Sequence, residues 1–305
     1  MCRKRKEHRR KTEEFLDHID PDIVISTGMS EKHFLCKINL SSNPAFVREC
    51  HFHKYYRRML AESPYEMLVT RLSESLDYYC SIRKFDRIVL LTEQDREDNW
   101  KGWNNVEVIP NPLITIPDII ATLENKIVIA AGRQVRQKNY SSLISAWRIV
   151  NASHPDWELR IFGDGPKRPE LENQIESMGL TGRIKLLGFS DDIQKEMSEA
   201  SICVLSTICE GFGLVIIVAM SCGLPVVSYD CPCGSKDIIS DGINGFLIHQ
   251  GNEQQLGDRI TNLIDDENLR LRLGAAALET TKMYQPELIA GLWMNLFRSL
   301  RPTNR

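Results

Sequence analysis

Residues 204–228 constrain the fold most. They have the pattern of a strand, a glycine-bearing loop, a short apolar helix, a tight turn and a second strand. The apolar run 214–220 is too short to span a bilayer, so it predicts a short buried helix. Gly223 stands where this helix ends, and Pro225 prevents the helix from continuing into the next strand. The stretch therefore predicts one strand–helix–strand unit of a sheet covered by helices.

The loop at 210–213 combines two features of a ligand site. The first turn of the following helix offers unpaired backbone N–H groups to an anion, and Gly213 stands at its entrance. The carboxylate of Glu210 suits a phosphate poorly, but it can accept hydrogen bonds from sugar hydroxyls in pairs. The loop thus indicates a ligand with both hydroxyls and phosphates, and a nucleotide sugar fits that description.

Strands and helices alternate along the chain. Further strand patterns occur at 22–26, 45–50, 87–92, 106–109, 126–131, 157–162, 184–187 and 246–248. Helical spacing of apolar residues fills several of the intervals, for example at 65–83 and 140–150. This alternation predicts an α/β fold with parallel, doubly wound sheets, in which ligands bind at the carboxyl ends of the strands.

The chain is long enough for two domains. Its 305 residues, 42% of them hydrophobic, can bury two cores of ordinary size. The apolar, proline-broken stretch after Asn111 predicts a linker. We expect a first Rossmann-like domain over 1–120, a second, nucleotide-sugar-binding domain over 121–285, and a C-terminal helix over 286–305 that packs back toward the first domain.

Composition limits the partners. The net charge of −3 gives no indication of a nucleic-acid partner. The basic stretch 3–11 is either the solvated face of a helix or a contact with anionic lipid headgroups. The nine cysteines are odd in number and scattered, which predicts a cytoplasmic protein without disulfides, peripheral at the inner membrane face if residues 3–11 contact lipid. Cys231 and Cys233 lack the spacing of a zinc half-site, so no metal is expected.

The stretch 210–228 resembles the signature of the retaining glycosyltransferases of family GT4, which have the GT-B fold of two Rossmann-like domains. The family pattern is a glutamate, seven residues and a second glutamate. Here Glu210 occupies the first position and Val218 the second. The resemblance is strongest over 127–247. A GT-B first domain normally begins with a strand and a glycine-rich loop, whereas this chain begins with a basic helix, so we expect an incomplete first domain.

The resemblance implies a diphosphate site after the strand at 126–131. Arg133 and Lys138 match the family's arginine and lysine that grip the donor diphosphate. Two fixed cations suit a diphosphate when no metal is present, because a charge-assisted hydrogen bond contributes about 1.5–3 kcal/mol. The alternative is a surface loop with incidental charges.

The resemblance also implies roles for the central loop. Glu210 would bond the donor sugar's hydroxyls, and its alternative role is that of an acid favoured at a helix entrance. The backbone N–H groups of Gly213, Leu214 and Val215 would face the distal phosphate and stabilise the leaving diphosphate.

Three further positions carry implied roles. Val218 stands where the family's glutamate binds the ribose; valine cannot accept those bonds, so we expect donor binding weakened by about ten-fold or more. Another ribose partner, a degenerate copy or a sequence variant would each account for this valine. Phe189 matches the position beside the nucleobase, and a core aromatic explains it equally well. His51 resembles a histidine near the reacting sugar, or it is structural.

The resemblance implies a metal-independent transferase with Glu210 and His51 as candidate catalytic residues. It would move a hexose from a UDP- or GDP-sugar to a hydroxyl of a glycan or lipid-linked acceptor with retention of configuration, in surface polysaccharide or lipopolysaccharide synthesis. Two alternatives stay open: an inactive or binding-only remnant, and a GT-B epimerase acting on the nucleotide sugar alone. The sequence lacks G-x-G-x-x-G, G-x-x-x-x-G-K-[ST] and G-x-S-x-G motifs, which disfavours a dehydrogenase, a nucleotide triphosphatase and a hydrolase.

Overall fold

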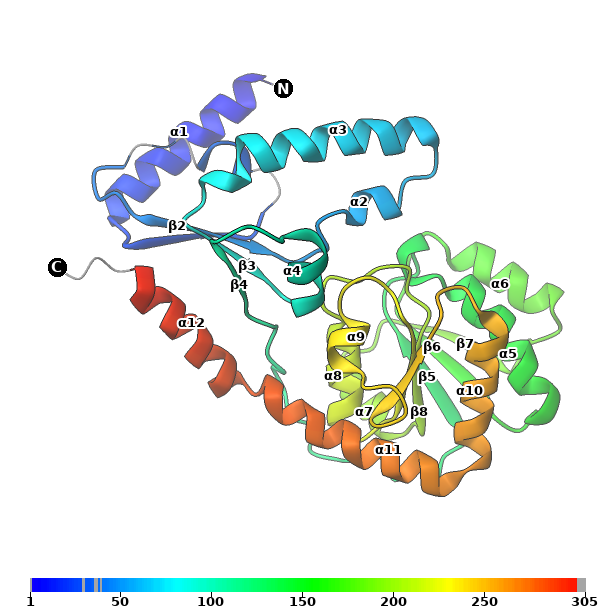
Figure 1. The fold of residues 1–305 in the computed structure, drawn as a ribbon. Helices are drawn as coiled ribbons and strands as arrows, with labels where there is room; N and C mark the ends of the chain where they lie inside the picture. Colours follow the sequence, from blue (N-terminus) through cyan, green and yellow to red (C-terminus); the bar gives the residue numbers. More distant parts are fainter. Residues whose placement is uncertain (1, 29–30, 36–37, 39, 301–305) are drawn as a thin grey trace. The chain divides into compact units, whose positions relative to one another are not determined.

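The computed structural model describes residues 2–300 except 29, 30, 36, 37 and 39 (Figure 1). The chain divides into two compact units: unit 1 comprises Met1–Pro110 and Glu287–Arg305, and unit 2 comprises Asn111–Pro286. The division precedes the expected boundary at residue 120. The reason lies in the backbone, because Leu113 donates to the carbonyl of Tyr284 at 2.7 Å and Ala121 donates to that of Cys222 at 2.9 Å. The expected linker is therefore part of unit 2.

Unit 1 is built on a parallel sheet in the order β1-β2-β3-β4. Its strands are β1 (Ile23–Ser26), β2 (Ala45–Cys50), β3 (Arg87–Leu90) and β4 (Val106–Val108), and its helices are α1 (Cys2–Ile19), α2 (Tyr56–Met59), α3 (Pro64–Cys80), α4 (Glu93–Asn99) and α12 (Pro286–Leu300). The described strands follow one another in sequence order, so this sheet is wound in one direction. No switch point occurs among them.

Both faces of this sheet are covered. Successive residues of a strand point to opposite faces, so Ile88 and Leu90 lie in one core and Val89 in the other. The first core also contains Leu16 of α1 and Trp100. The second core contains Val47, Ile109, Ile289 and Leu296, the last two from α12 (Figure 1). The C-terminal helix thus belongs to the core of unit 1.

The helix predicted over 65–83 is present as α3, but its apolar stripe is exposed. Ser63 caps its start by accepting a hydrogen bond from the backbone of the first turn at 3.1 Å. At least half of the surface of each apolar residue in this stripe is exposed: Met67, Leu68, Leu72 and Leu76. Their helical spacing therefore predicted the helix correctly without indicating which face it buries.

The basic stretch 3–11 lies in α1. Ion pairs between positions four apart run along this helix, and the shortest joins Arg10 to Glu14 at 2.5 Å. The side chains of residues 3–5 lie outside the described part. Such exposed pairs contribute only about 0.3–0.5 kcal/mol each. None of the helices in the described residues is both long enough and apolar enough to cross a membrane.

Unit 2 is built on a parallel six-stranded sheet in the order β10-β9-β8-β5-β6-β7. Its strands are β5 (Ile127–Ala131), β6 (Glu158–Phe162), β7 (Ile184–Gly188), β8 (Ile202–Leu205), β9 (Val226–Tyr229) and β10 (Gly245–Ile248). Its helices are α5 (Tyr140–Ser153), α6 (Arg168–Ser177), α7 (Ile193–Ser198), α8 (Leu214–Ser221), α9 (Ser235–Ile238), α10 (Glu253–Asp265) and α11 (Glu267–Thr280) (Figure 1).

The strand order of unit 2 reverses between β5 and β8. From β5 the chain adds β6 and β7 on one side, then returns to place β8 directly on the other side of β5. β8 and β9 are buried along their whole length, as expected for parallel strands covered on both faces. Ligands of doubly wound sheets bind at the carboxyl ends of the strands where the order reverses. The strand order therefore predicts a ligand site at the loops that follow β5 and β8.

Candidate active site

The reversal of strand order brings together the two loops predicted to hold a donor. The loop after β5 carries Arg133 and Lys138, and the loop after β8 carries Glu210 and Gly213. Lys138 Nζ lies 2.5 Å from Glu210 Oε1, although the two residues are 72 positions apart. Their side chains are only 16% and 11% exposed. A cation for phosphate and a carboxylate for hydroxyls thus meet at the switch point.

Hydrogen bonds between the two loops hold this pair in place. Ser206 donates through its hydroxyl to the carbonyl of Lys138 at 2.8 Å. The amide of Gln137 donates to the carbonyl of Cys209 at 2.7 Å, and the backbone N–H of Ile208 donates to the carbonyl of Gln137 at 2.8 Å. These bonds join the two loops through their backbones. They therefore hold Lys138 and Glu210 close together in addition to the ion pair between the two side chains.

The turn that carries Arg133 rests on the end of β6. Gly163 has φ +112°, and a Cβ on it would lie 2.2 Å from the carbonyl oxygen of Gly132. The fully buried side chain of Gln134 donates to the carbonyl of Gly163 at 2.7 Å. The side chain of Arg133 is exposed, and among the described residues it has no hydrogen-bond or ion-pair partner. The backbone here is fixed while the guanidinium is available to a ligand.

The start of α8 lies against the loop that follows β9. Gly213 caps the helix with φ +90°. Gly234, after β9, has φ +114°, and a Cβ on it would lie 2.3 Å from the carbonyl oxygen of Phe212. Leu214 is exposed and Val215 is half-buried, whereas Ile216 is fully buried. The helix therefore begins with an exposed residue and is mostly buried from Ile216 onward. The N–H groups of its first turn have no intrahelical i−4 partner and are the groups that a phosphate at a helix start binds.

The remaining predicted residues lie at defined places. Phe189, after β7, is 82% exposed, so its interpretation as a core aromatic is wrong. Val218 lies on α8 and is half-buried. His51 belongs to unit 1, where it follows β2, and its Nε2 lies 3.4 Å from Glu49 Oε2.

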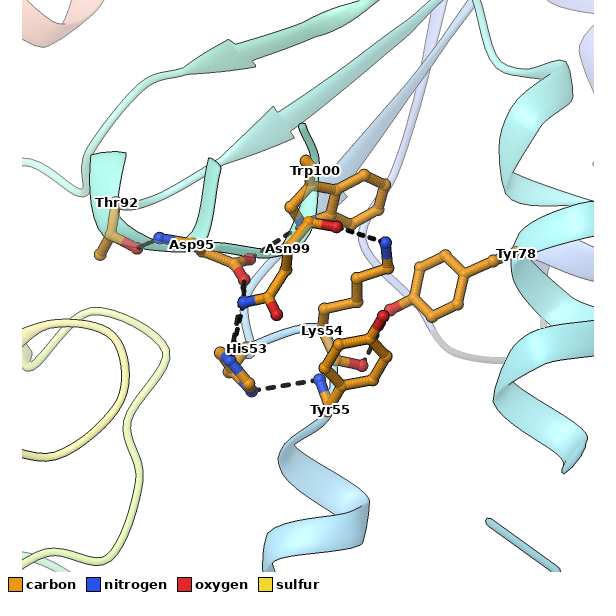
Figure 2. Close-up of polar contacts among 8 residues, drawn as sticks. All are labelled: His53, Lys54, Tyr55, Tyr78, Thr92, Asp95, Asn99 and Trp100. Carbon is orange, nitrogen blue, oxygen red and sulfur yellow. Dashed lines mark hydrogen bonds and ion pairs between the residues drawn. The ribbon is translucent and has the colours of Figure 1, made fainter. Parts of the chain in front are cut away.

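His53, two residues after His51, is fixed inside unit 1 (Figure 2). Its Nδ1 accepts the backbone N–H of Tyr55 at 3.1 Å, and its Nε2 lies 2.9 Å from the amide of Asn99. Asp95 in turn accepts from Asn99 at 2.8 Å. Burial lowers the pKa of His53, and the negative charge of Asp95 opposes this. His53 is thus a structural residue that anchors the segment after β2.

The charges of Lys138 and Glu210 act on the pKa values of two buried cysteines, Cys209 and Cys231. Burial raises the pKa of Cys209 to about 11 and that of Cys231 to about 12, and Glu210 adds to both shifts. Because the thiolate is the reactive form, we expect Cys231 to resist alkylation at mildly alkaline pH while the exposed Cys80 reacts. Peptide mass spectrometry after brief iodoacetamide treatment checks this. Equal labelling of Cys80 and Cys231 in the folded protein would contradict the described burial.

Comparison with known proteins decides the family. The family model described as glycosyl transferases group 1 matches residues 116–280, more than half of the chain and both loops of the site. The chain belongs to this family. The whole of the matched range lies within unit 2.

Individual relatives are similar over most of this chain. An uncharacterized glycosyltransferase of Haemophilus influenzae is 29% identical over 230 residues, covering 74% of this chain and 65% of the relative. The poly(ribitol-phosphate) α-N-acetylglucosaminyltransferase of Staphylococcus aureus is 30% identical over 221 residues, covering 71% of this chain and 44% of the relative. The chain thus spans less than two thirds of the length of these relatives.

A solved structure has the same fold. The structure of a TarM variant of S. aureus in complex with fondaparinux, α-GlcNAc-glycerol and UDP superposes with a TM-score of 0.79 at 26% identity. The superposition covers 93% of this chain and 58% of the TarM chain. The GT-B fold expected from the sequence is therefore confirmed for this group 1 glycosyltransferase.

Some residues that shape the site had no recognisable role in the sequence. Gly163 was evident only as part of a turn, and Gln134 gave no signal. Ser235 is fully buried, and its hydroxyl donates to the carbonyl of Tyr229 at 3.0 Å, which fixes the loop after β9. Glycines placed directly after strands were the one available signal, since close backbone approach at a strand end requires them.

Proposed function

We propose that this protein transfers a hexose from a nucleotide diphosphate sugar to an acceptor hydroxyl, with retention of the anomeric configuration. The observation that carries the proposal is the meeting of Lys138 and Glu210 at the switch point of unit 2, beside the first turn of α8. Membership of the group 1 glycosyltransferases supports the same reaction class.

The two halves of the donor would use different groups. Lys138 and the exposed Arg133 would bind the diphosphate, and the N–H groups at the start of α8 would stabilise the distal phosphate as negative charge builds on it. Glu210 would accept hydrogen bonds from the sugar hydroxyls. In this arrangement protein cations balance the diphosphate, so we propose that the reaction needs no metal ion.

The transfer step follows from this placement. The bond between the anomeric carbon and the phosphate oxygen breaks, and the acceptor oxygen bonds to that carbon on the same face. The proton of the acceptor hydroxyl passes to the leaving diphosphate. His51 would contact the sugar or the acceptor. The S. aureus relative is named for a poly(ribitol-phosphate) acceptor, which supports a surface polymer as the product, made in the cytoplasm where nucleotide sugars occur.

The direct test is release of nucleoside diphosphate from UDP-glucose, UDP-N-acetylglucosamine or GDP-mannose, with and without a polyol phosphate acceptor. Glu210→Gln keeps the side-chain size and removes the charge, and we expect a loss of turnover of about ten- to hundred-fold. If no donor is turned over, the proposal fails: a donor that binds without turnover supports the binding-only alternative, and the absence of donor binding supports the inactive one. If the sugar is altered while it stays on the nucleotide, the protein is an epimerase.

Val218→Glu tests the placement of the ribose. A glutamate at this half-buried position of α8 can accept hydrogen bonds from the two ribose hydroxyls, so we expect UDP or GDP to bind about ten-fold more tightly. Calorimetric titration measures the change, and Val218→Leu serves as the apolar control. Equal affinities in the two variants would place the ribose elsewhere.

A further inference from the structure

Unit 1 contains a second group of cations, which none of the roles above uses. They line a cavity of about 150 Å³ beside α3. Its walls are formed by Ser75, three cations and three aromatic rings: Lys54, Arg58, Arg83, Tyr55, Tyr78 and Trp103. Among the described residues, no carboxylate lines this cavity. The cavity therefore presents positive charge against aromatic walls.

Lys54 is held in a defined position (Figure 2). Its Nζ lies 4.5 Å from the centre of the Trp100 ring and 4.9 Å from that of Tyr78. It donates to the carbonyl of Asn99 at 2.5 Å, and the hydroxyl of Tyr78 donates to the carbonyl of Lys54 at 2.9 Å. Aromatic faces attract cations, so this ammonium is fixed rather than free to swing into solvent.

The two arginines also lie against rings. The guanidinium of Arg58 is 4.1 Å from the centre of the Tyr55 ring, and that of Arg83 is 5.1 Å from a ring of Trp103. Arg58 Nε also pairs with Glu74 Oε2 at 2.6 Å. The planar groups are thus oriented before any ligand arrives.

Like charges gathered at one cavity disfavour one another. Burial lowers the pKa of Lys54, Asp95 opposes this shift, and Arg58 and Arg83 lower the pKa further. An anion between the three side chains would reverse this repulsion.

We propose that this cavity binds a phosphate group. Guanidinium groups match the oxygens of phosphate in geometry and stay charged at any physiological pH, and several fixed cations favour a doubly charged anion over a carboxylate. A cavity of this volume accepts a benzene-sized molecule in another protein, so it has room for phosphate. The site belongs to unit 1 and is distinct from the donor diphosphate residues of unit 2.

The first test is calorimetric titration of the full chain with inorganic phosphate. We expect saturable binding that weakens about ten-fold or more in Arg83→Gln. Arg96→Gln is the matched control, because Arg96 is an exposed arginine of α4 in the same unit, paired with Glu93 at 2.7 Å. Arg133→Gln in unit 2 should keep this binding, which separates the result from the donor site.

A second pair of variants keeps the test decisive if Arg83→Gln does not fold. Ser75 lines the cavity from an exposed position on α3. Ser75→Asp adds a negative charge there, whereas Ser75→Asn has nearly the same shape and no charge. We expect Ser75→Asp to weaken phosphate binding about ten-fold and Ser75→Asn to leave it nearly unchanged.

Two arms identify where the phosphate comes from. Inorganic pyrophosphate represents a soluble ligand, and phosphatidylcholine vesicles with or without phosphatidic acid represent a lipid headgroup. Binding in one arm that Arg83→Gln or Ser75→Asp removes supports the site and names its source. No binding in either arm, or binding that both changes leave intact, overturns the proposal.

Discussion

Lys138→Met is expected to lower the affinity for a nucleotide diphosphate sugar by about 100-fold. The change removes a charge-assisted hydrogen bond to the diphosphate, about 1.5–3 kcal/mol. It also leaves the largely buried carboxylate of Glu210 without its partner at 2.5 Å, next to an anionic ligand. Calorimetric titration with UDP-glucose and GDP-mannose measures the loss.

The matched control is Lys126→Met. Lys126 also pairs with a carboxylate, that of Asp156, at 2.5 Å. However, it directly precedes β5, so it lies at the amino end of this strand, opposite the end where the donor is expected to bind. Removing this lysine should leave donor affinity unchanged. If both variants bind the donor equally well, the diphosphate does not lie at the carboxyl ends of the strands of unit 2.

Gly163→Ala is expected to destabilise unit 2 by about 3 kcal/mol or more. The added Cβ would lie 2.2 Å from the carbonyl oxygen of Gly132, on a residue whose φ of +112° already disfavours a side chain. Relief of this clash must move the turn that carries Arg133, so donor affinity should fall as well. Urea unfolding and donor titration together measure both effects.

Gly182→Ala separates the clash from the backbone conformation. Gly182 has φ +79°, and a Cβ there would meet no atom of the described residues within 4 Å. We expect a loss of only about 1–2 kcal/mol and unchanged donor affinity. Equal losses from the two alanines would show that the approach of Gly163 to Gly132 has no special importance for the site.

The most deeply buried strands could be predicted from the sequence because a parallel strand covered on both faces is apolar along most of its length. The apolar runs that this requires are visible locally, as at β5 and β8. Burial of helices was less predictable. α5 buries the face formed by Leu143, Ile144 and Trp147, whereas α3 exposes an equally regular stripe. The spacing of apolar residues identifies a helix, but whether its apolar face is buried depends on which elements pack against it in the fold.

The geometry of the candidate site could be predicted only in part. The residues after β5 and β8 were expected to bind a donor, but the contact of Lys138 with Glu210 depends on β8 lying beside β5. That neighbourhood is a property of strand order, and no local pattern encodes it. The role of Gly163 depends likewise on a carbonyl distant in the sequence. Close approaches of this kind become visible only in three dimensions.

Amide hydrogen exchange with and without nucleotide sugar tests the central claim most directly. The claim is that a donor binds at the switch point between β5 and β8. Saturating UDP-glucose or GDP-mannose, whichever binds, is predicted to slow exchange in residues 132–138 and 206–216, including the amides of Gly213, Leu214 and Val215. Tight binding that protects other segments and leaves both of these unchanged would contradict the account.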